Sequence, residues 1–242
     1  MLDSVHDPHH HDHHHEHFRS EPGATAVQVQ MEQKILAKND HLAEHNRQWL
    51  TDRRILAVNL MSSPGSGKTT LLERTLRECE AARPASVIEA DQETLFDAER
   101  IRAVGSPVVQ VNTGAGCHLD AAMVGAAMQR LDPAPGSVLF IENVGNLVCP
   151  ALFKLGEHAN VVLVSVPEGA DKPMKYPQMF QAGSLVVLNK IDLLPYIDFD
   201  VERFTGYVRQ VNPTAELIQV SATRGDGLPQ WYEWLARAAA AQ

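Results

Sequence analysis

The sequence has few cysteines, no long apolar run and no cluster of basic residues. Only three of its 242 residues are cysteine, so they cannot all pair, and we expect free thiols in a reducing cytoplasm. There is no run of about eighteen apolar residues, which argues against a membrane span. The net charge of −9, without a basic block, gives no electrostatic footprint for nucleic acid. The polar N-terminus does not fit a secretory signal, so we expect a cytoplasmic protein.

The N-terminus is instead rich in histidine, with eight of the twelve histidines between residues 6 and 17. We expect residues 1–22 to form a disordered tail, because so polar a segment cannot bury a core. Neutral imidazoles bind nickel, zinc, copper and cobalt, so the tail is a candidate metal buffer that releases its ions below about pH 6.5. Asp12 splits the run into two triplets, unlike the contiguous histidines of a purification tag. The histidines of this tail are His6, His9, His10, His11, His13, His14, His15 and His17.

Residues 23–52 have the pattern of an amphipathic helix, because apolar residues recur every seven positions with further apolar residues beside them. We expect this helix to pack on the main domain, and the alternative is a docking helix for a partner chain. Its apolar stripe comprises Ile35, Leu36, Leu42, Ala43, Trp49 and Leu50.

From residue 53 to residue 242, short aliphatic runs alternate with helical patterns. This alternation predicts an α/β fold, a mostly parallel sheet with helices on both faces. The expected strands are Ile55–Leu60, Ser86–Ala90, Val108–Val111, Val138–Ile141, Val161–Val166, Leu185–Leu188 and Leu217–Val220. The expected helices are Thr69–Cys79, Thr94–Ala103, His118–Leu131, Val201–Val211 and Leu228–Ala239.

A glycine-rich segment between the first strand and the next helix predicts a phosphate-binding loop. Glycines let backbone N–H groups converge on phosphates, and the helix N-terminus adds its dipole. We expect Lys68 to reach the β- and γ-phosphates and the Thr69 hydroxyl to bind Mg²⁺. The usual first glycine of the motif is replaced by Ser62. The expected nucleotide-binding residues of this loop are Gly65, Ser66, Gly67, Lys68, Thr69 and Thr70.

A second motif, Asn189, Lys190 and Asp192, closes a later strand. A carboxylate at the position of Asp192 accepts two N–H bonds from guanine, whereas adenine leaves it unpaired, so we expect GTP and GDP as ligands. Ser221 and Ala222 end the last strand, where a backbone N–H can meet the guanine carbonyl.

The segment Glu142–Gly145 stands where GTPases usually carry Asp-x-x-Gly. We expect Glu142 near Mg²⁺ or the attacking water, and the Gly145 N–H near the γ-phosphate. Asp91, at the end of the second strand, is a further candidate for Mg²⁺ binding or water positioning. The alternative is that either carboxylate caps a following helix.

Cys117, His118 and Cys149 form a candidate transition-metal site. The strands that precede them can deliver their loops to the same end of the sheet, and two thiolates with one imidazole suit Zn²⁺ or Ni²⁺. Cys79 lies within a helical pattern and is expected to be a packing residue. Since Cys149 follows Gly145 by four residues, we expect metal binding and nucleotide state to be coupled.

Together these motifs resemble the hydrogenase nickel-incorporation GTPases, the HypB family. The resemblance covers residues 53–235. It implies a G domain of the signal-recognition/MinD class that forms a GTP-dependent homodimer, with Ni²⁺ or Zn²⁺ held by the three metal-site residues. It also implies nickel insertion into the [NiFe]-hydrogenase large subunit precursor, with a HypA-type nickel chaperone as partner and the histidine tail as a nickel store. The matching segments are SSPGSGKTT at 62–70, VIEADQ at 87–92, VNTGAGCHLDA at 111–121, IENVGNLVCP at 141–150, EGADKPMKYP at 168–177 and LNKIDLLPY at 188–196.

Two other functions compete with this interpretation. The urease nickel GTPases have Cys-Pro-His at their metal site, whereas Cys117 and His118 are adjacent here. A nickel-storage protein would use GTP only for regulation.

No cysteine precedes Cys79, so the N-terminal Cys-x-x-Gly-Cys nickel site of some HypB members is missing. No arginine finger is visible, so we expect slow intrinsic hydrolysis.

Overall fold

The computed structural model describes residues 22–79, 83–91, 96–114 and 116–242, and for residues 22–29, 32, 79 and 91 it describes the backbone alone. The histidines of the expected tail lie outside these residues, so the predicted metal buffer stays a prediction. The chain divides into two compact units between Ile35 and Leu36, inside helix α1 (Pro22–Asp52). No helix in the described part of the chain is long and apolar enough to span a membrane.

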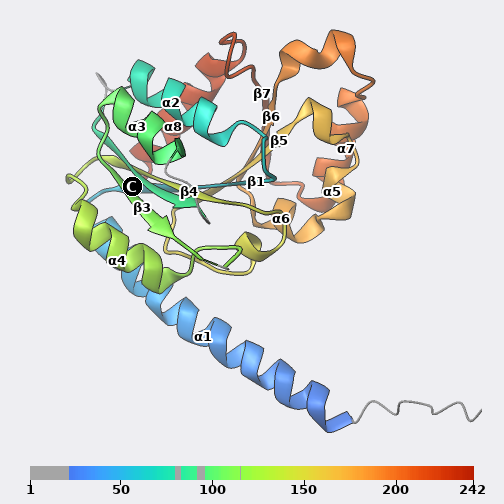
Figure 1. Cartoon of the computed structure of the whole chain (residues 1–242). Helices are drawn as coiled ribbons and strands as arrows, with labels where there is room; N and C mark the ends of the chain where they lie inside the picture. The colour runs from blue at the N-terminus through green and yellow to red at the C-terminus, as the bar shows by residue number, and fades with distance from the viewer. Residues whose placement is uncertain (1–21, 80–82, 92–95, 115) are drawn as a thin grey trace, which may run out of the picture. The chain divides into compact units, whose positions relative to one another are not determined.

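The second unit is built on a seven-stranded sheet with the order β3-β2-β4-β1-β5-β6-β7 (Figure 1). Every neighbouring pair is parallel, which confirms the predicted fold class and all seven expected strands. Strands buried on both faces must be apolar throughout, which explains their near-continuous aliphatic runs. The strands are β1 (Leu56–Ser62), β2 (Ala85–Asp91), β3 (Val108–Asn112), β4 (Val138–Gly145), β5 (Ala159–Ser165), β6 (Leu185–Asn189) and β7 (Glu216–Gln219).

Helices connect the strands and cover both faces of the sheet. The expected long helices are present, and the short α5 and α6, which the sequence pattern did not reveal, follow β5. Beyond α1 the helices are α2 (Lys68–Cys79), α3 (Phe96–Val104), α4 (Ala121–Leu131), α5 (Lys172–Lys175), α6 (Pro177–Ala182), α7 (Val201–Val211) and α8 (Leu228–Ala240). In the described part of the chain, 3₁₀ turns occupy Cys149–Ala151, Val166–Glu168 and Ile191–Tyr196.

Two boundaries differ from the sequence-based expectation in ways that matter for the site. Helix α4 begins at Ala121 rather than at His118, because the Asp120 side chain caps it by accepting a 2.8 Å hydrogen bond from the Met123 N–H. His118 therefore lies in a loop. Strand β4 does not end at Ile141 but continues to Gly145, so the whole Glu142–Gly145 segment is extended backbone.

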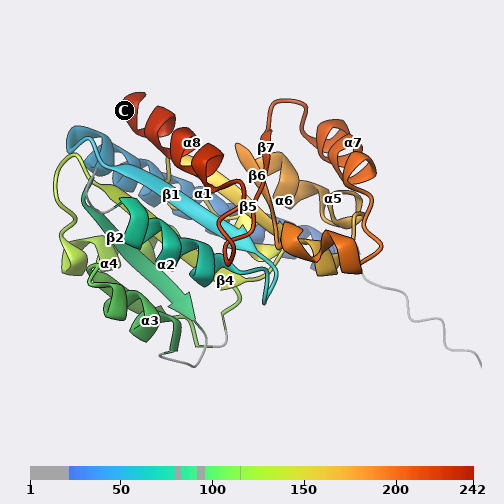
Figure 2. The ribbon, with the colours of Figure 1, turned by 90° about the horizontal axis from the view of Figure 1, so that it is seen from above.

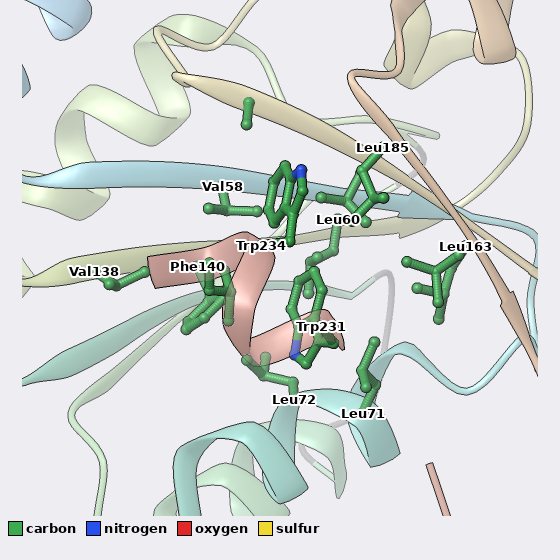
Figure 3. Close-up of a cluster of buried hydrophobic side chains, with 14 of the residues drawn as sticks. Val58, Leu60, Leu71, Leu72, Val138, Phe140, Leu163, Leu185, Trp231 and Trp234 are labelled. Carbon is green, nitrogen blue, oxygen red and sulfur yellow. The ribbon is translucent and has the colours of Figure 1, made fainter. Parts of the chain in front are cut away.

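The alternation of side chains along β1 and β4 fills two cores. Val58 and Phe140 face a cluster under α2 and α8, whereas Ala57 and Ile141 face a cluster under α4. In the first cluster the fully buried Trp231 of α8 packs among aliphatic side chains of α2 and the sheet (Figure 3), and its indole N–H donates to Thr75 Oγ1 at 2.8 Å. A third cluster joins β5 and β6 to α6 and α7. Helices α2 and α8 thus lie on one face of the sheet and α4 on the other, above and below the strands in Figure 1, and Figure 2 looks onto the face that α2 and α8 cover.

Because the strands are parallel, their carboxyl ends meet at one edge of the sheet. The loops that follow β1, β3, β4, β6 and β7 carry nearly all the residues that the sequence singled out. This topology is the usual position of a ligand site in α/β proteins.

Candidate nucleotide and metal sites

The phosphate loop connects β1 to α2, as the sequence predicts. Gly65 and Gly67 have φ values of +72° and +99°, which L-residues rarely adopt. A Cβ atom on Gly67 would lie 2.5 Å from Asn189 Nδ2, so the loop also packs too closely for any side chain there. The glycines are therefore needed both for backbone shape and for contact with the strand end that carries the guanine motif.

A cavity of about 510 Å³ opens over this loop, within the range of small-ligand sites. It brings together eight predicted residues with three charged residues that sequence reasoning missed, Glu89, Asp97 and Arg100. These three come from β2 and α3, and no motif marks them, since only the fold turns them toward the loop. The predicted residues in the cavity wall are Gly65, Gly67, Lys68, Thr69, Thr70, Glu142, Gly145 and Lys190.

Lys68 lies at the cavity wall, and its Nζ donates to Ser62 Oγ at 2.9 Å. Ser66 Oγ donates to the same oxygen at 2.6 Å. Burial lowers the pKa of Lys68, while the nearby Glu142 carboxyl opposes that shift. Ser62, the departure from the usual motif, thus supplies an acceptor that holds the lysine in place.

Glu142 is buried against the phosphate loop. Its Oε1 accepts a 2.6 Å hydrogen bond from Thr69 Oγ1, and its Oε2 has no hydrogen-bond partner among the described residues. Burial raises the pKa of Glu142, with Lys68 and Thr69 acting in the opposite direction. Glu89 lies opposite it in the β2–β4 register. A hydroxyl and an unpartnered carboxylate oxygen fit the hard-oxygen preference of Mg²⁺.

Neither of the two carboxylates predicted near Mg²⁺ can be assigned a capping role here. Glu142 lies inside β4 and caps no following helix, so the capping alternative is wrong for it. Asp91 ends β2, and its side chain lies outside the described atoms, so its role stays a prediction.

The guanine motif follows β6 and is tied to the phosphate loop. Asn189 donates to the Ser66 carbonyl at 2.9 Å and accepts from the Ala222 N–H at 3.1 Å. Lys190 Nζ donates to the Gly65 carbonyl at 2.6 Å. Asp192 Oδ1 accepts from Ser221 Oγ at 2.6 Å.

The structure therefore brings together all five residues predicted for guanine recognition. Asn189 acts as a brace between two loops, which leaves the Asp192 carboxylate as the group suited to read the base edge.

The segment after β5 also contacts the phosphate loop. Glu168 accepts hydrogen bonds from Ser63 Oγ and, at 2.8 Å, from the Ser165 N–H and hydroxyl, and Lys172 Nζ lies 4.0 Å from it. The EGADKP motif thus contacts the phosphate loop through the hydrogen bond between Glu168 and Ser63.

The predicted metal ligands converge. One ligand atom from each of Cys117, His118 and Cys149 lies within 4.8 Å of the others, and the two sulfur atoms are 2.7 Å apart. The His118 ring stacks on Phe153 with a centroid distance of 3.9 Å. Two soft sulfur donors and one imidazole nitrogen fit Zn²⁺ or thiolate-bound Ni²⁺, with one coordination position left over.

The local environment favours a neutral imidazole and couples the two thiols. Burial lowers the pKa of His118. The hydrogen-bonding contact with Cys117, reinforced by burial, raises the pKa of the Cys149 thiol. The side chain of Cys79 lies outside the described atoms, so its expected packing role is untested.

The parallel sheet, the phosphate loop at the β1–α2 junction and the guanine motif after β6 define a P-loop GTPase fold. The chain belongs to the CobW/HypB/UreG family, whose nucleotide-binding domain matches residues 56–219. This confirms the resemblance drawn from the motifs.

Its relatives include hydrogenase maturation factors HypB. The factor from Azotobacter vinelandii is 56% identical over 209 residues, which cover 86% of this chain and 69% of the relative. That from Escherichia coli K12 is 56% identical over 207 residues, covering 86% and 71%. Among solved structures, HypB from Helicobacter pylori in complex with nickel superimposes with a TM-score of 0.79 at 36% identity, covering 84% of this chain and 95% of that one.

Proposed function

We propose that this protein is a GTP-hydrolysing nickel metallochaperone that delivers nickel to the [NiFe]-hydrogenase large subunit during maturation. The observation that carries the proposal is the convergence of Cys117, His118 and Cys149, from loops at the same edge of the sheet as the phosphate loop. Cys149 lies just past β4, the strand that bears Glu142. A role in hydrogenase maturation is supported by the relatives named hydrogenase maturation factors. Nickel binding is supported by the nickel complex of the H. pylori neighbour.

In the proposed reaction the phosphate loop binds GTP and the guanine motif selects the base. Lys68 exchanges its Ser62 contact for the β- and γ-phosphates. Thr69 and Glu142 would hold Mg²⁺, which would neutralise charge on the phosphates. Asp91 or Glu142 orients the attacking water, and the Gly145 N–H senses the γ-phosphate.

Intrinsic hydrolysis is proposed to be slow. Arg100 lines the cavity, but its guanidinium forms ion pairs with Glu73 at 2.6 Å and with Asp97 at 3.2 Å. An arginine held by two carboxylates is not free to neutralise charge on a transferring phosphoryl group. Acceleration would then have to come from dimerisation or a partner.

Strand β4 supports coupling between the two sites. Successive side chains of a strand point to opposite faces, so Glu142 reaches Thr69 of the phosphate loop, whereas the Asn143 side chain bonds Leu119 and Asn59, although Asn143 also borders the cavity. Asn143 Oδ1 accepts from the N–H of Leu119 at 3.4 Å, and Leu119 is the residue directly after His118. Its Nδ2 donates to Asn59 Oδ1 at 3.2 Å. A rearrangement of β4 would then reach both metal-ligand loops, through Asn143 and through Cys149.

The remaining parts of the proposal concern partners and storage. The histidine tail would hold nickel in reserve. A HypA-type chaperone, the large subunit precursor and a GTP-dependent homodimer are the proposed partners, in the cytoplasm. The names of the relatives, hydrogenase maturation factors, support the large subunit precursor as a partner.

Nickel titration of the full-length protein in GDP and in a non-hydrolysable GTP analogue tests the proposal. Thiolate-to-nickel absorption in the near ultraviolet reports on the cysteine site alone, because the tail has no thiolate, and light scattering follows dimerisation. We expect a nucleotide-dependent affinity that is lost in Cys117→Ala and Cys149→Ala. Equal affinity in both nucleotide states would contradict the delivery mechanism. Hydrogenase maturation that survives Lys68→Ala in cells would favour the storage protein instead.

A further inference from the structure

Helix α1 reaches both metal-ligand loops through two buried asparagines. Asn39 Oδ1 accepts from the Ala121 N–H at 2.9 Å, and its Nδ2 donates to the Lys154 carbonyl at 2.8 Å. Asn46 Nδ2 donates to the Ala121 carbonyl at 2.8 Å and to the Leu155 carbonyl at 2.9 Å. The two asparagines are only 6% and 5% exposed. Each of them therefore bridges the same two loops.

These anchor points are close in sequence to the metal ligands. Ala121 is the third residue after His118 and the first of α4. Lys154 and Leu155 follow Phe153, the residue whose ring stacks on His118 and whose loop carries Cys149. The ligand pair Cys117–His118 and the ligand Cys149 thus belong to two loops that α1 ties together.

The helix fits these loops too closely for a loose association. A Cβ atom on Gly156 would lie 2.6 Å from Asn46 Cβ and 2.7 Å from the Ala43 carbonyl oxygen. A Cβ atom on Gly125 in α4 would lie 2.9 Å from Asn46 Oδ1. Gly156 and Gly125 thus bring their backbones directly against Asn46 of α1. Because this contact is close-packed, the distance between the two loops can change little while α1 is docked.

We propose that Asn39 and Asn46 are positioning residues of the metal centre, and that α1, which precedes the matched nucleotide-binding domain, fixes the distance between the two ligand loops. This inference rests on the proposed metal function of Cys117, His118 and Cys149. The sheet brings the loops to the same edge, and the asparagines set their separation. Thermodynamic reciprocity adds a consequence: metal bound to the three ligands favours the docked helix by the same factor by which docking favours metal.

The test uses the full-length protein and Ni²⁺ as the probe, followed by thiolate-to-nickel absorption. Replacing both asparagines, Asn39→Ala with Asn46→Ala, is expected to weaken the thiolate site by about 10- to 100-fold, the range typical of outer-shell partners. GDP affinity should stay unchanged. The matched control is Asn212→Ala, which removes another buried asparagine that donates to the Phe180 and Gly183 carbonyls, far from the metal ligands in the chain. This control should keep the wild-type nickel affinity.

The outcomes separate the two proposals. Absence of a thiolate band in the wild-type protein overturns the metal site itself. A normal band with wild-type affinity in the double variant overturns the positioning role alone, and so does an equal loss in Asn212→Ala.

Hydrogen exchange of the wild-type protein provides a readout that does not depend on the folding of the variants. Amide exchange of residues 36–50 is expected to slow on addition of Ni²⁺, and this slowing should vanish in Cys149→Ala. Exchange that does not respond to nickel in the wild-type protein, while the thiolate band forms, would refute the link between α1 and the metal centre.

Discussion

The neutral histidine that joins α1 to β1 makes the stability of the protein depend on pH in a predictable way. His158 Nδ1 accepts from the Ala57 N–H at 3.1 Å, and its Nε2 lies 3.3 Å from Thr51 Oγ1 at the end of α1. Burial, together with the charge of Arg47, lowers the pKa of His158 from 6.5 to about 4. A protonated ring would lose the acceptor that the Ala57 N–H requires.

The sign follows from comparing the folded and unfolded chains. Below about pH 6.5 the unfolded chain binds a proton at this histidine, whereas the folded chain does so only near pH 4. The contribution is therefore complete above pH 6.5 and is lost as the pH falls from about 6.5 to about 4. The gap between the two pKa values corresponds to at most about 3.4 kcal/mol. Because the ring is only half-buried, solvent screening reduces this to about 1–2 kcal/mol.

Denaturant unfolding at pH 7 and pH 5 measures this loss, and His158→Asn is the matched control. The asparagine carbonyl oxygen can still accept from the Ala57 N–H but does not titrate. We expect the free energy of unfolding of the wild-type protein to fall by about 1 kcal/mol more than that of the variant between these pH values. Equal losses in the two proteins would refute the assignment of the titration to His158.

Three further predictions address the nucleotide site, the coupling and the core. Gly67→Ala should abolish GDP binding, measured with a fluorescent GDP analogue, because its Cβ would collide with the Asn189 side chain at the end of β6. Gly105→Ala, with a similar φ of +94° but open space around it, should still bind. Asn143→Ala should reduce the difference in nickel affinity between the GDP and GTP-analogue states, and an unchanged difference would remove Asn143 from the coupling route. Asn160→Ala, which removes the acceptor of the Asn59 amide at the other end of this chain of amides, should preserve the difference. Trp231→Ala should cost about 3–5 kcal/mol in denaturant unfolding, since the indole is fully buried, and a loss under about 1 kcal/mol would show that the core beneath α8 collapses to fill the space.

The sequence by itself determined the local elements and the chemistry of the motifs. The strands were predictable because aliphatic runs bounded by turns need no distant partner to be recognised. The phosphate loop and the guanine motif were predictable for a similar reason, since residues such as Gly67, Lys68 and Asp192 carry their function in a short stretch of chain. The pairing of Cys117–His118 with Cys149 followed from the rule that parallel strands end at the same edge.

Only the tertiary structure decided which other residues stand around these motifs. Glu89 and Arg100 reach the cavity from β2 and α3, and no local pattern distinguishes them from other charged residues. Asn39 and Asn46 looked like ordinary polar positions of an amphipathic helix, yet they hold two loops whose anchor residues lie from 75 to 115 positions further along the chain. Such contacts depend on the packing of the whole domain, because their partners are backbone groups, which every residue carries and which no sequence motif can mark.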